Sequence, residues 1–261
     1  KNLIKFFWNS FYKKEVSNME IIVQKFGGSS VANTDKLFNV CKHITKEKNK
    51  GNAVVVVVSA QGKTTDDLIR QEKEITDKPN KREHDMLVSV GEQISVAKLA
   101  MCLEELGYEA KTYLGWQVPI ITDSNFGDAN VTEVKTSKVI QDLEKGKIVV
   151  VAGFQGIDKN GDITTLGRGG SDTTAIALAA ALNSKKCEIF TDVDGVYSED
   201  PNKNKNAIRY DKISYEKMLE MANNGARVLH NKCVKLAQEK KVKIIVKSTF
   251  KEESQGTIVE A

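Results

Sequence analysis

The chain has 261 residues, 40% of them hydrophobic and 28% charged, which is the composition of an ordinary globular protein. Its 39 basic and 35 acidic residues leave a net charge of +4, which suits an anionic ligand but is too small and too mixed to indicate a nucleic-acid binder. No run approaches the ~18 apolar residues of a membrane span, so we expect neither nucleic acid nor a membrane as a partner.

Residues 1–18 form a basic segment with apolar side chains at helical spacing, such as Leu3, Phe7 and Phe11. A helix that lies on a membrane surface has this pattern. However, no signal-type cleavage region follows, and the first residue is not Met. We interpret residues 1–18 as an upstream or cloning-derived extension before a natural start near Met19, with membrane tethering as the alternative.

In the first half of the chain, apolar runs predict strands at 21–26, 53–58, 110–114 and 118–122. The run of valines at 53–58 is typical of a parallel strand that is covered on both faces. Leu37, Val40, Cys41 and Ile44 predict one apolar helix face. A second helix is predicted at 86–106, with an apolar stripe through Leu87, Ile94, Ala97 and Met101. Residues 61–83 are polar and are predicted to be flexible.

In the second half, the same pattern predicts strands at 147–154, 186–191 and 243–248, the last of which ends the sheet. Helices are predicted at 173–182 and, as a pair broken near 223–225, within 214–240. The residues Asp-Lys-Asn-Gly at 158–161 indicate a hairpin turn. Strands that alternate with helices predict an α/β fold, a three-layer αβα sandwich around a mainly parallel sheet.

The cysteines are widely spaced, at Cys41, Cys102, Cys187 and Cys233. This spacing excludes a CxxC redox or zinc pattern, and the three histidines form no HExxH pair. We therefore expect reduced thiols, a cytoplasmic protein and no metal site built from protein ligands.

The first cluster with chemical potential follows the first predicted strand, at residues 25–30. Gly27 and Gly28 let the main chain approach a phosphate closely, and Lys25 supplies a positive charge at the strand end. Parallel sheets bind ligands at the carboxyl ends of their strands, which is where this cluster lies. The alternative is a tight turn with an exposed lysine.

The second cluster, residues 164–174, combines three glycines with Arg168 and a hydroxyl-rich helix start. Ser171 is a suitable N-cap, and Asp172 suits the positive end of a helix dipole. Arg168 can bind a carboxylate through two hydrogen bonds. The alternative is a capped helix after a glycine loop, but an arginine between glycines has little to pack against.

The third cluster, residues 191–201, places acidic residues and a glycine after a strand. Asp192 suits contact with a Mg-nucleotide or a ribose, and Tyr197 could pack on a base. Without other signals, this pattern is more often a turn. Two apparent motifs are excluded: Gly62 lacks the upstream glycine of a P-loop, because position 57 is Val57, and Thr173 interrupts a dinucleotide-binding GxGxxG.

Taken together, the clusters resemble the catalytic domain of the aspartokinase family, in the amino-acid kinase superfamily. The matching segments are KFGGSS at 25–30, GEQIS at 91–95, VAGFQG at 151–156, TTLGRGGSDTT at 164–174, TDVDGVYSEDP at 191–201 and KST at 247–249. They occur in family order over residues 19–261, and TTLGRGGSD is highly specific. The resemblance implies transfer of the γ-phosphate of ATP to the side-chain carboxylate of L-aspartate, the entry step of lysine, threonine and methionine synthesis.

The resemblance also implies roles for individual residues. Lys25 and Asp172 would be catalytic. The residues implied for aspartate binding are Ser59, Thr65, Glu92, Arg168 and Ser171. The residues implied for nucleotide binding are Gly27, Gly28, Ser29, Gly169, Gly170, Thr191, Asp192, Tyr197, Arg227, Lys247 and Ser248. Mg²⁺ would be carried by the ATP phosphates.

Domain organisation follows from the same resemblance. The N-terminal part of 19–261 would bind aspartate and the C-terminal part ATP, in a protein that could form a homo-oligomer. The family normally continues into two regulatory ACT domains, so we expect an excised or truncated catalytic domain. Asn202 and Arg227 depart from the usual DPR and GAKVLHP patterns, which bears on ATP affinity. The alternative function is an inactive remnant that binds ATP or aspartate without turnover.

Overall fold

The computed structural model describes residues 20–201, 203–226, 228–251 and 254–261. The interpretation of residues 1–18 and of a start near Met19 therefore lies outside the described residues. The predictions for Asn202 and Arg227 do so as well.

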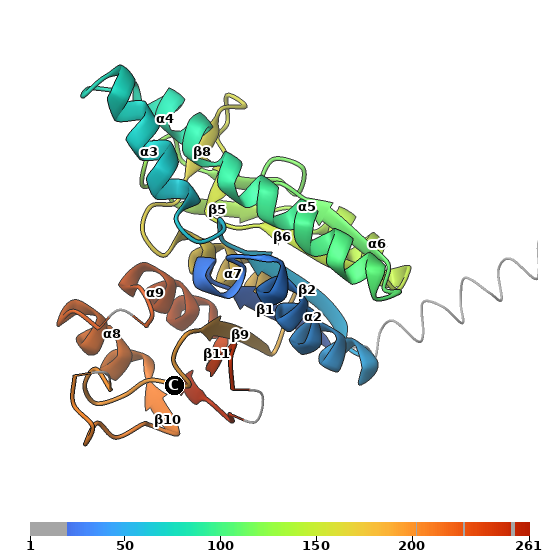
Figure 1. Ribbon diagram of the computed structural model, residues 1–261, viewed down its shortest axis with the longest axis vertical. Coiled ribbons are helices and arrows are strands. Elements are labelled where there is room, and N and C mark those ends of the chain that lie inside the picture. The colour runs from blue at the N-terminus through green and yellow to red at the C-terminus, as the bar shows by residue number, and fades with distance from the viewer. Residues whose placement is uncertain (1–19, 202, 227, 252–253) are drawn as a thin grey trace, which may run out of the picture.

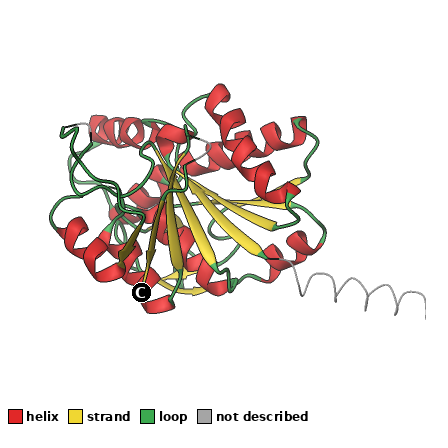
Figure 2. Ribbon diagram, turned by 90° about the horizontal axis from the view of Figure 1, so that it is seen from below, coloured by secondary structure: helices red, strands yellow, loops and turns green. Residues whose placement is uncertain are grey.

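A large, mainly parallel sheet forms the centre of the molecule, as the sequence predicts (Figure 2). Among the described residues its strand order is β10-β12-β11-β9-β1-β2-β6-β3, and the β11–β12 pair is antiparallel while the other pairs are parallel. The strands are β1 (Ile21–Phe26), β2 (Ala53–Val58), β3 (Ala110–Tyr113), β6 (Ile148–Ala152), β9 (Lys186–Thr191), β10 (Lys212–Ser214), β11 (Lys243–Ser248) and β12 (Thr257–Glu260).

Helices cover both faces of this sheet, because successive side chains of a strand point to opposite sides. In β2, Val54, Val56 and Val58 join a buried cluster with α2 (Thr34–Asn49) and α5 (Val90–Glu105). The intervening Val55 and Val57 join a second cluster, to which the helices of the opposite face contribute. Those helices are α6 (Ser137–Glu144), α7 (Gly170–Ala181), α8 (Tyr215–Asn223) and α9 (Asn231–Lys240) (Figure 1). The three-layer prediction is confirmed, as is the break between α8 and α9.

A second, smaller sheet carries the segments that lead into the glycine-rich loop. Its strands are β5 (Val131–Val134), β4 (Ile120–Thr122), β7 (Gln155–Ile157) and β8 (Ile163–Thr165), in that spatial order. β7 and β8 are antiparallel around the predicted hairpin turn, which Gly161 closes by donating its main-chain N–H to Asp158 O at 3.1 Å. These strands are short and partly polar, so their apolar pattern is too weak to predict β5, β7 and β8 from the sequence.

The prediction of a flexible region at 61–83 is wrong. The structure has α3 (Thr64–Ile75) there, and α4 (Lys81–Val88) begins within it. In the described structure, Glu72 is the buried residue of α3, so the helix has no apolar stripe to reveal it. Glu72 instead accepts a hydrogen bond from the His84 ring on α4 at 2.9 Å, which joins the two helices. The strand at 243–248 is also not the last, because β12 follows it.

The apolar stripe of the helix predicted at 86–106 is not its buried face, and the single helix is two helices. The helix divides at Ser89 into α4 and α5, and Ile94 and Met101 are 41% and 65% exposed. The buried face of α5 contains Leu99 and Leu103 instead. The helical stretch Lys81–Glu105 is long enough to cross a membrane, and an 18-residue window within it has a mean hydropathy of 1.4, but 56% of that window is buried in the fold. Core helices of soluble proteins pass the same test.

We expect Leu99→Ala to lower the free energy of unfolding by about 2–5 kcal/mol, because it leaves a cavity between α5 and the sheet. Met101→Ala on the same helix should change it by less than about 0.5 kcal/mol, because Met101 is an exposed side chain. Urea unfolding of both variants measures the difference. Equal losses of unfolding free energy in the two variants would mean that α5 is rotated about its axis and does not bury the face that contains Leu99.

Candidate active site

The clusters that the sequence singled out follow strands whose carboxyl ends lie side by side. β11, β9, β1, β2 and β6 are parallel neighbours, so the loops after them leave from one edge of the sheet. Main-chain hydrogen bonds join these exits. Ser59 N donates to Phe26 O at 3.1 Å, Gly153 N to Val58 O at 3.0 Å and Thr249 N to Thr191 O at 2.9 Å.

Lys25 and Asp172 form an ion pair at this edge, with 2.6 Å between Lys25 Nζ and Asp172 Oδ1. Lys25 lies near the end of β1, and Asp172 lies in the first turn of α7, where the helix dipole favours a negative charge. Both side chains are only 12% exposed. Two residues separated by most of the chain thus form one charged unit, and Gly27 lies beside the Lys25 amine.

The turn after β1 is packed tightly against the loop after β2. Gly28 begins a short 3-10 helix, Gly28–Ser30, and a side chain at Gly28 would lie 2.7 Å from Ala60 O. Gly62 N donates to Gly28 O at 3.0 Å, which holds the two loops together. The turn that contains Gly27 and Gly28 therefore lies against the loop that begins at Ser59, and a ligand shared by these residues stays a prediction.

Glu92 is a buried carboxylate in the first turn of α5. Its Oε1 accepts a hydrogen bond from Ala60 N at 3.0 Å, whereas Oε2 has no hydrogen-bond partner in the described part of the chain. Burial raises the Glu92 pKa to about 8, although the Ala60 N–H opposes the rise. A buried carboxylate with a free oxygen is costly, and it is suited to a positively charged ligand.

The helix that contains Thr65 begins beside Glu92. A side chain at Gly91 would lie 3.5 Å from the methyl group of Thr64. Thr65 is half-buried in the first turn of α3. The structure thus brings Ser59, Thr65 and Glu92 to one region.

The glycine-rich loop leads into α7. The prediction of Ser171 as the N-cap is wrong, because α7 already begins at Gly170. Its N-cap is Gly169, which has φ 68°, an angle that glycine adopts without strain. Ser171 is buried and packs against Gly153. A Cβ atom added at Gly153 would lie 2.7 Å from Ser171 Oγ. Arg168 is exposed and makes no hydrogen bond or ion pair with the described residues. Arg168 is therefore available to a ligand.

Phe154 is a feature of this region that the sequence interpretation did not assign. It has φ 69°, a left-handed conformation that is uncommon for a bulky residue and often marks functional sites. Its N–H donates to Thr174 Oγ1 at 3.1 Å, and its ring lies against Gly170. The segment VAGFQG was the available signal, but it does not reveal the backbone angle.

The residues predicted for the nucleotide lie after β9 and near the end of β11. Ser248 pairs with Thr191 across these strands, and Thr191 Oγ1 donates to Asp192 Oδ1 at 3.0 Å. Lys247 and Tyr197 have protein partners as well: Lys247 Nζ lies 2.8 Å from Glu188 Oε1, and Tyr197 OH donates to Asp194 Oδ1 at 2.6 Å. Their contact with a nucleotide stays a prediction.

Titratable groups elsewhere give little indication of a second site. The four cysteines all lie in described ranges, and they are free and buried. Within the described ranges, no group of three His, Cys, Asp or Glu residues is placed to hold a metal ion.

Comparison with known proteins agrees with this geometry. Residues 20–248 match the amino acid kinase family. The aspartokinase of Bacillus sp. (strain MGA3) is 53% identical over 242 residues, which are 93% of this chain and 59% of that protein. This chain therefore spans little more than half the length of that curated relative.

Two solved structures share the fold. Aspartate kinase from Synechocystis has a TM-score of 0.81 at 43% identity, covering 92% of this chain and 40% of the other. E. coli aspartokinase III, in complex with aspartate and ADP, has a TM-score of 0.82 at 29% identity, covering 92% and 64%.

We expect Glu92→Gln to stabilise the protein at alkaline pH. The Glu92 pKa rises from 4.5 to about 8 on folding, so the folded state holds the proton more tightly and stability falls as pH rises through this window. Glutamine cannot ionise and can still accept from Ala60 N. Thermal unfolding at about pH 9 should show a gain on the order of 5 °C. The gain in melting temperature should vanish near pH 4.5, the ordinary pKa of this side chain. An equal gain near pH 4.5 and at about pH 9 would contradict the raised pKa of Glu92.

Proposed function

The chain belongs to the amino acid kinase family, and on that premise we propose that it transfers the γ-phosphoryl group of ATP to the side-chain carboxylate of L-aspartate. The products would be 4-phospho-L-aspartate and ADP. The observation that carries the proposal is the unpartnered, buried carboxylate of Glu92 at the sheet edge that also holds the Lys25–Asp172 pair. One site thus offers both a partner for an ammonium group and a charge for a phosphoryl group.

The proposed step needs charge neutralisation rather than a base. A carboxylate oxygen of aspartate attacks the γ-phosphorus, and the bond from that phosphorus to the bridging oxygen of ADP breaks. The acceptor carboxylate is already ionised at neutral pH, so no proton has to be removed. Lys25 would neutralise charge on the phosphoryl group together with the N–H groups of Gly27 and Gly28, and Asp172 would hold the Lys25 amine in place.

The two other charges of aspartate would be bound by opposite charges. Arg168 would bind the α-carboxylate through two hydrogen bonds, because its guanidinium group is exposed and unpaired in the described structure. Glu92 would bind the α-ammonium group, which supplies the partner that Oε2 lacks and favours the ionised carboxylate. Ser59, Thr65 and Ser171 would add hydroxyl contacts.

ATP would bind on the C-terminal side of the same edge. Ser29, Gly169 and Gly170 would contribute to the phosphate site, and Thr191, Asp192, Tyr197, Lys247 and Ser248 would contact the rest of the nucleotide. The similar E. coli aspartokinase III was solved in complex with aspartate and ADP, which supports the use of an adenine nucleotide. Mg²⁺ would be bound by the phosphates, since this cation retains water and needs few protein carboxylates. A cytoplasmic location and assembly into a homo-oligomer stay predictions.

The decisive experiment is a coupled ADP-release assay with aspartate, glutamate, acetylglutamate and UMP as acceptors. Turnover that is selective for aspartate supports the proposal. Turnover with another acceptor alone would reassign the chain within the family. Binding of ATP or aspartate by calorimetry without turnover would favour the inactive alternative.

We expect Lys25→Ala to lower kcat by at least about 100-fold, because the charge that Lys25 meets grows during transfer. The KM for aspartate should change little. Lys159→Ala, an exposed lysine in the β7–β8 turn, is the matched control and should behave as the wild type. An unchanged kcat in Lys25→Ala would remove Lys25 from the mechanism.

Arg168→Ala should raise the KM for aspartate by roughly 10- to 100-fold, the value of a charge-assisted bidentate contact. Its kcat should fall much less, because the α-carboxylate does not react. Arg168→Lys should recover part of the loss, since it keeps the charge but not the planar geometry. Steady-state kinetics of the wild type and of the two variants at varied aspartate concentration measures KM and kcat for each. A lower kcat at constant KM would argue against this role.

A further inference from the structure

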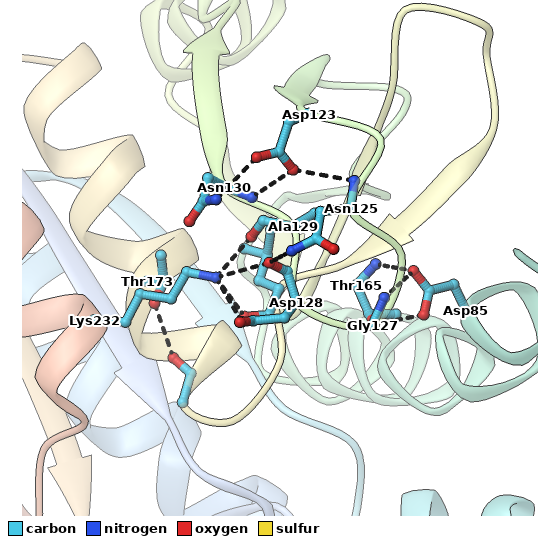
Figure 3. Close-up of polar contacts among 12 residues, drawn as sticks. Asp85, Asp123, Asn125, Gly127, Asp128, Ala129, Asn130, Thr165, Thr173 and Lys232 are labelled. Carbon is cyan, nitrogen blue, oxygen red and sulfur yellow. Dashed lines mark hydrogen bonds and ion pairs between the residues drawn. The ribbon is translucent and has the colours of Figure 1, made fainter. Parts of the chain in front are cut away.

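Lys232, in the first turn of α9, connects that helix to two segments beside the glycine-rich loop. Its Nζ donates to Asp128 Oδ1 at 2.8 Å, to Ala129 O at 2.8 Å and to Leu166 O at 3.1 Å, with Asp128 O at 3.4 Å (Figure 3). The Lys232 side chain is only 22% exposed. An ammonium group has three donors, so these contacts use its full capacity on one small region.

The two segments that Lys232 contacts are also bound to each other. Ala129 N donates to Thr165 O at 2.9 Å. The completely buried carboxylate of Asp85, on α4, accepts from Gly127 N at 3.0 Å and from Thr165 N at 2.7 Å (Figure 3). The main chain before the glycine-rich loop is therefore held by Asp85 on one side and by Lys232 on the other.

Packing leaves this segment little freedom. Gly167 has φ 73°, and a side chain there would lie 2.6 Å from Asp128 Oδ1. The side chain of His230, at the start of α9, lies directly against Gly169. α9 thus contacts the glycine-rich loop on both sides of Arg168, although α9 follows it by more than 60 residues in the sequence.

We propose that Lys232 is a positioning residue for Arg168. By binding the carbonyl oxygen of Leu166, two residues before Arg168, it sets the direction in which the arginine leaves the main chain. The kinetic consequence of this inference rests on the proposed function, in which Arg168 binds the α-carboxylate of aspartate. It makes aspartate binding depend on a helix that lies outside the acceptor pocket. Without the Lys232 amine, the carbonyl oxygens of the buried residues Ala129 and Leu166 lose this hydrogen-bond donor.

The kinetic test compares Lys232→Met with Lys235→Met, an exposed lysine on the same helix. Lys232→Met should raise the KM for aspartate about tenfold and leave the KM for ATP within about twofold. In an Arg168→Ala background, it should have no further effect, because the group that it positions is gone. Lys232→Arg should restore part of the affinity. Full additivity of Lys232→Met with Arg168→Ala would overturn the inference.

A second measurement separates this inference from the proposed reaction. Amide hydrogen exchange of the ligand-free protein should be faster in Lys232→Met at 127–130 and 166–169, but not in β2. This result with no aspartate turnover in the wild type would retain the positioning role and reject the reaction. Unchanged exchange at both segments, or a uniform increase throughout the chain, would overturn the positioning role. If Lys232→Met does not fold, Lys232→Gln, which keeps two donors, is measured in its place.

Discussion

The ion pair between Lys25 and Asp172 is the interaction on which the arrangement of the site depends. A lysine near the end of a central strand and an aspartate at the start of a buried helix are held 2.6 Å apart where water is largely excluded. Either charge alone would be costly at this depth. The pair is therefore stable only if β1 and α7 keep their relative position, which the packing of α7 against the sheet ensures. The charges that we propose to act in phosphoryl transfer are thus coupled to core packing.

Glu92 shows the opposite situation, a buried carboxyl group whose negative charge the protein does not compensate. One oxygen has a main-chain donor and the other has no partner in the described structure, so folding raises the Glu92 pKa. Such local conflicts with stability are expected at functional sites, where a ligand supplies the missing interaction. A positively charged group of a ligand would supply the partner that Glu92 Oε2 lacks. The energetic cost at Glu92 is consistent with selectivity for an acceptor that carries an ammonium group.

The glycine-rich loop depends on parts of the chain that do not belong to it. Its main chain is held from α4 by Asp85 and from α9 by Lys232, while its own residues supply conformational freedom and the exposed Arg168. A loop of glycines has high entropy when it is free. External hydrogen bonds of this kind keep it ordered without filling the space that a ligand needs. The order of the glycine-rich loop thus comes from the hydrogen bonds of Asp85 and Lys232 rather than from the residues of the loop.

The sequence by itself determined the strands at 21–26, 53–58, 186–191 and 243–248, because each contains a short apolar run, which at 53–58 is continuous as in a strand buried on both faces. It also located the loops of the candidate site, since the carboxyl ends of parallel strands share an edge. Only the tertiary structure decided the rest. α3 and α4 lack an apolar stripe, the buried face of α5 is set by its neighbours, and the partners of Glu92 and Lys232 are distant in the sequence. Periodicity records which side chains are apolar, whereas burial of polar groups depends on contacts that form only when the chain is folded.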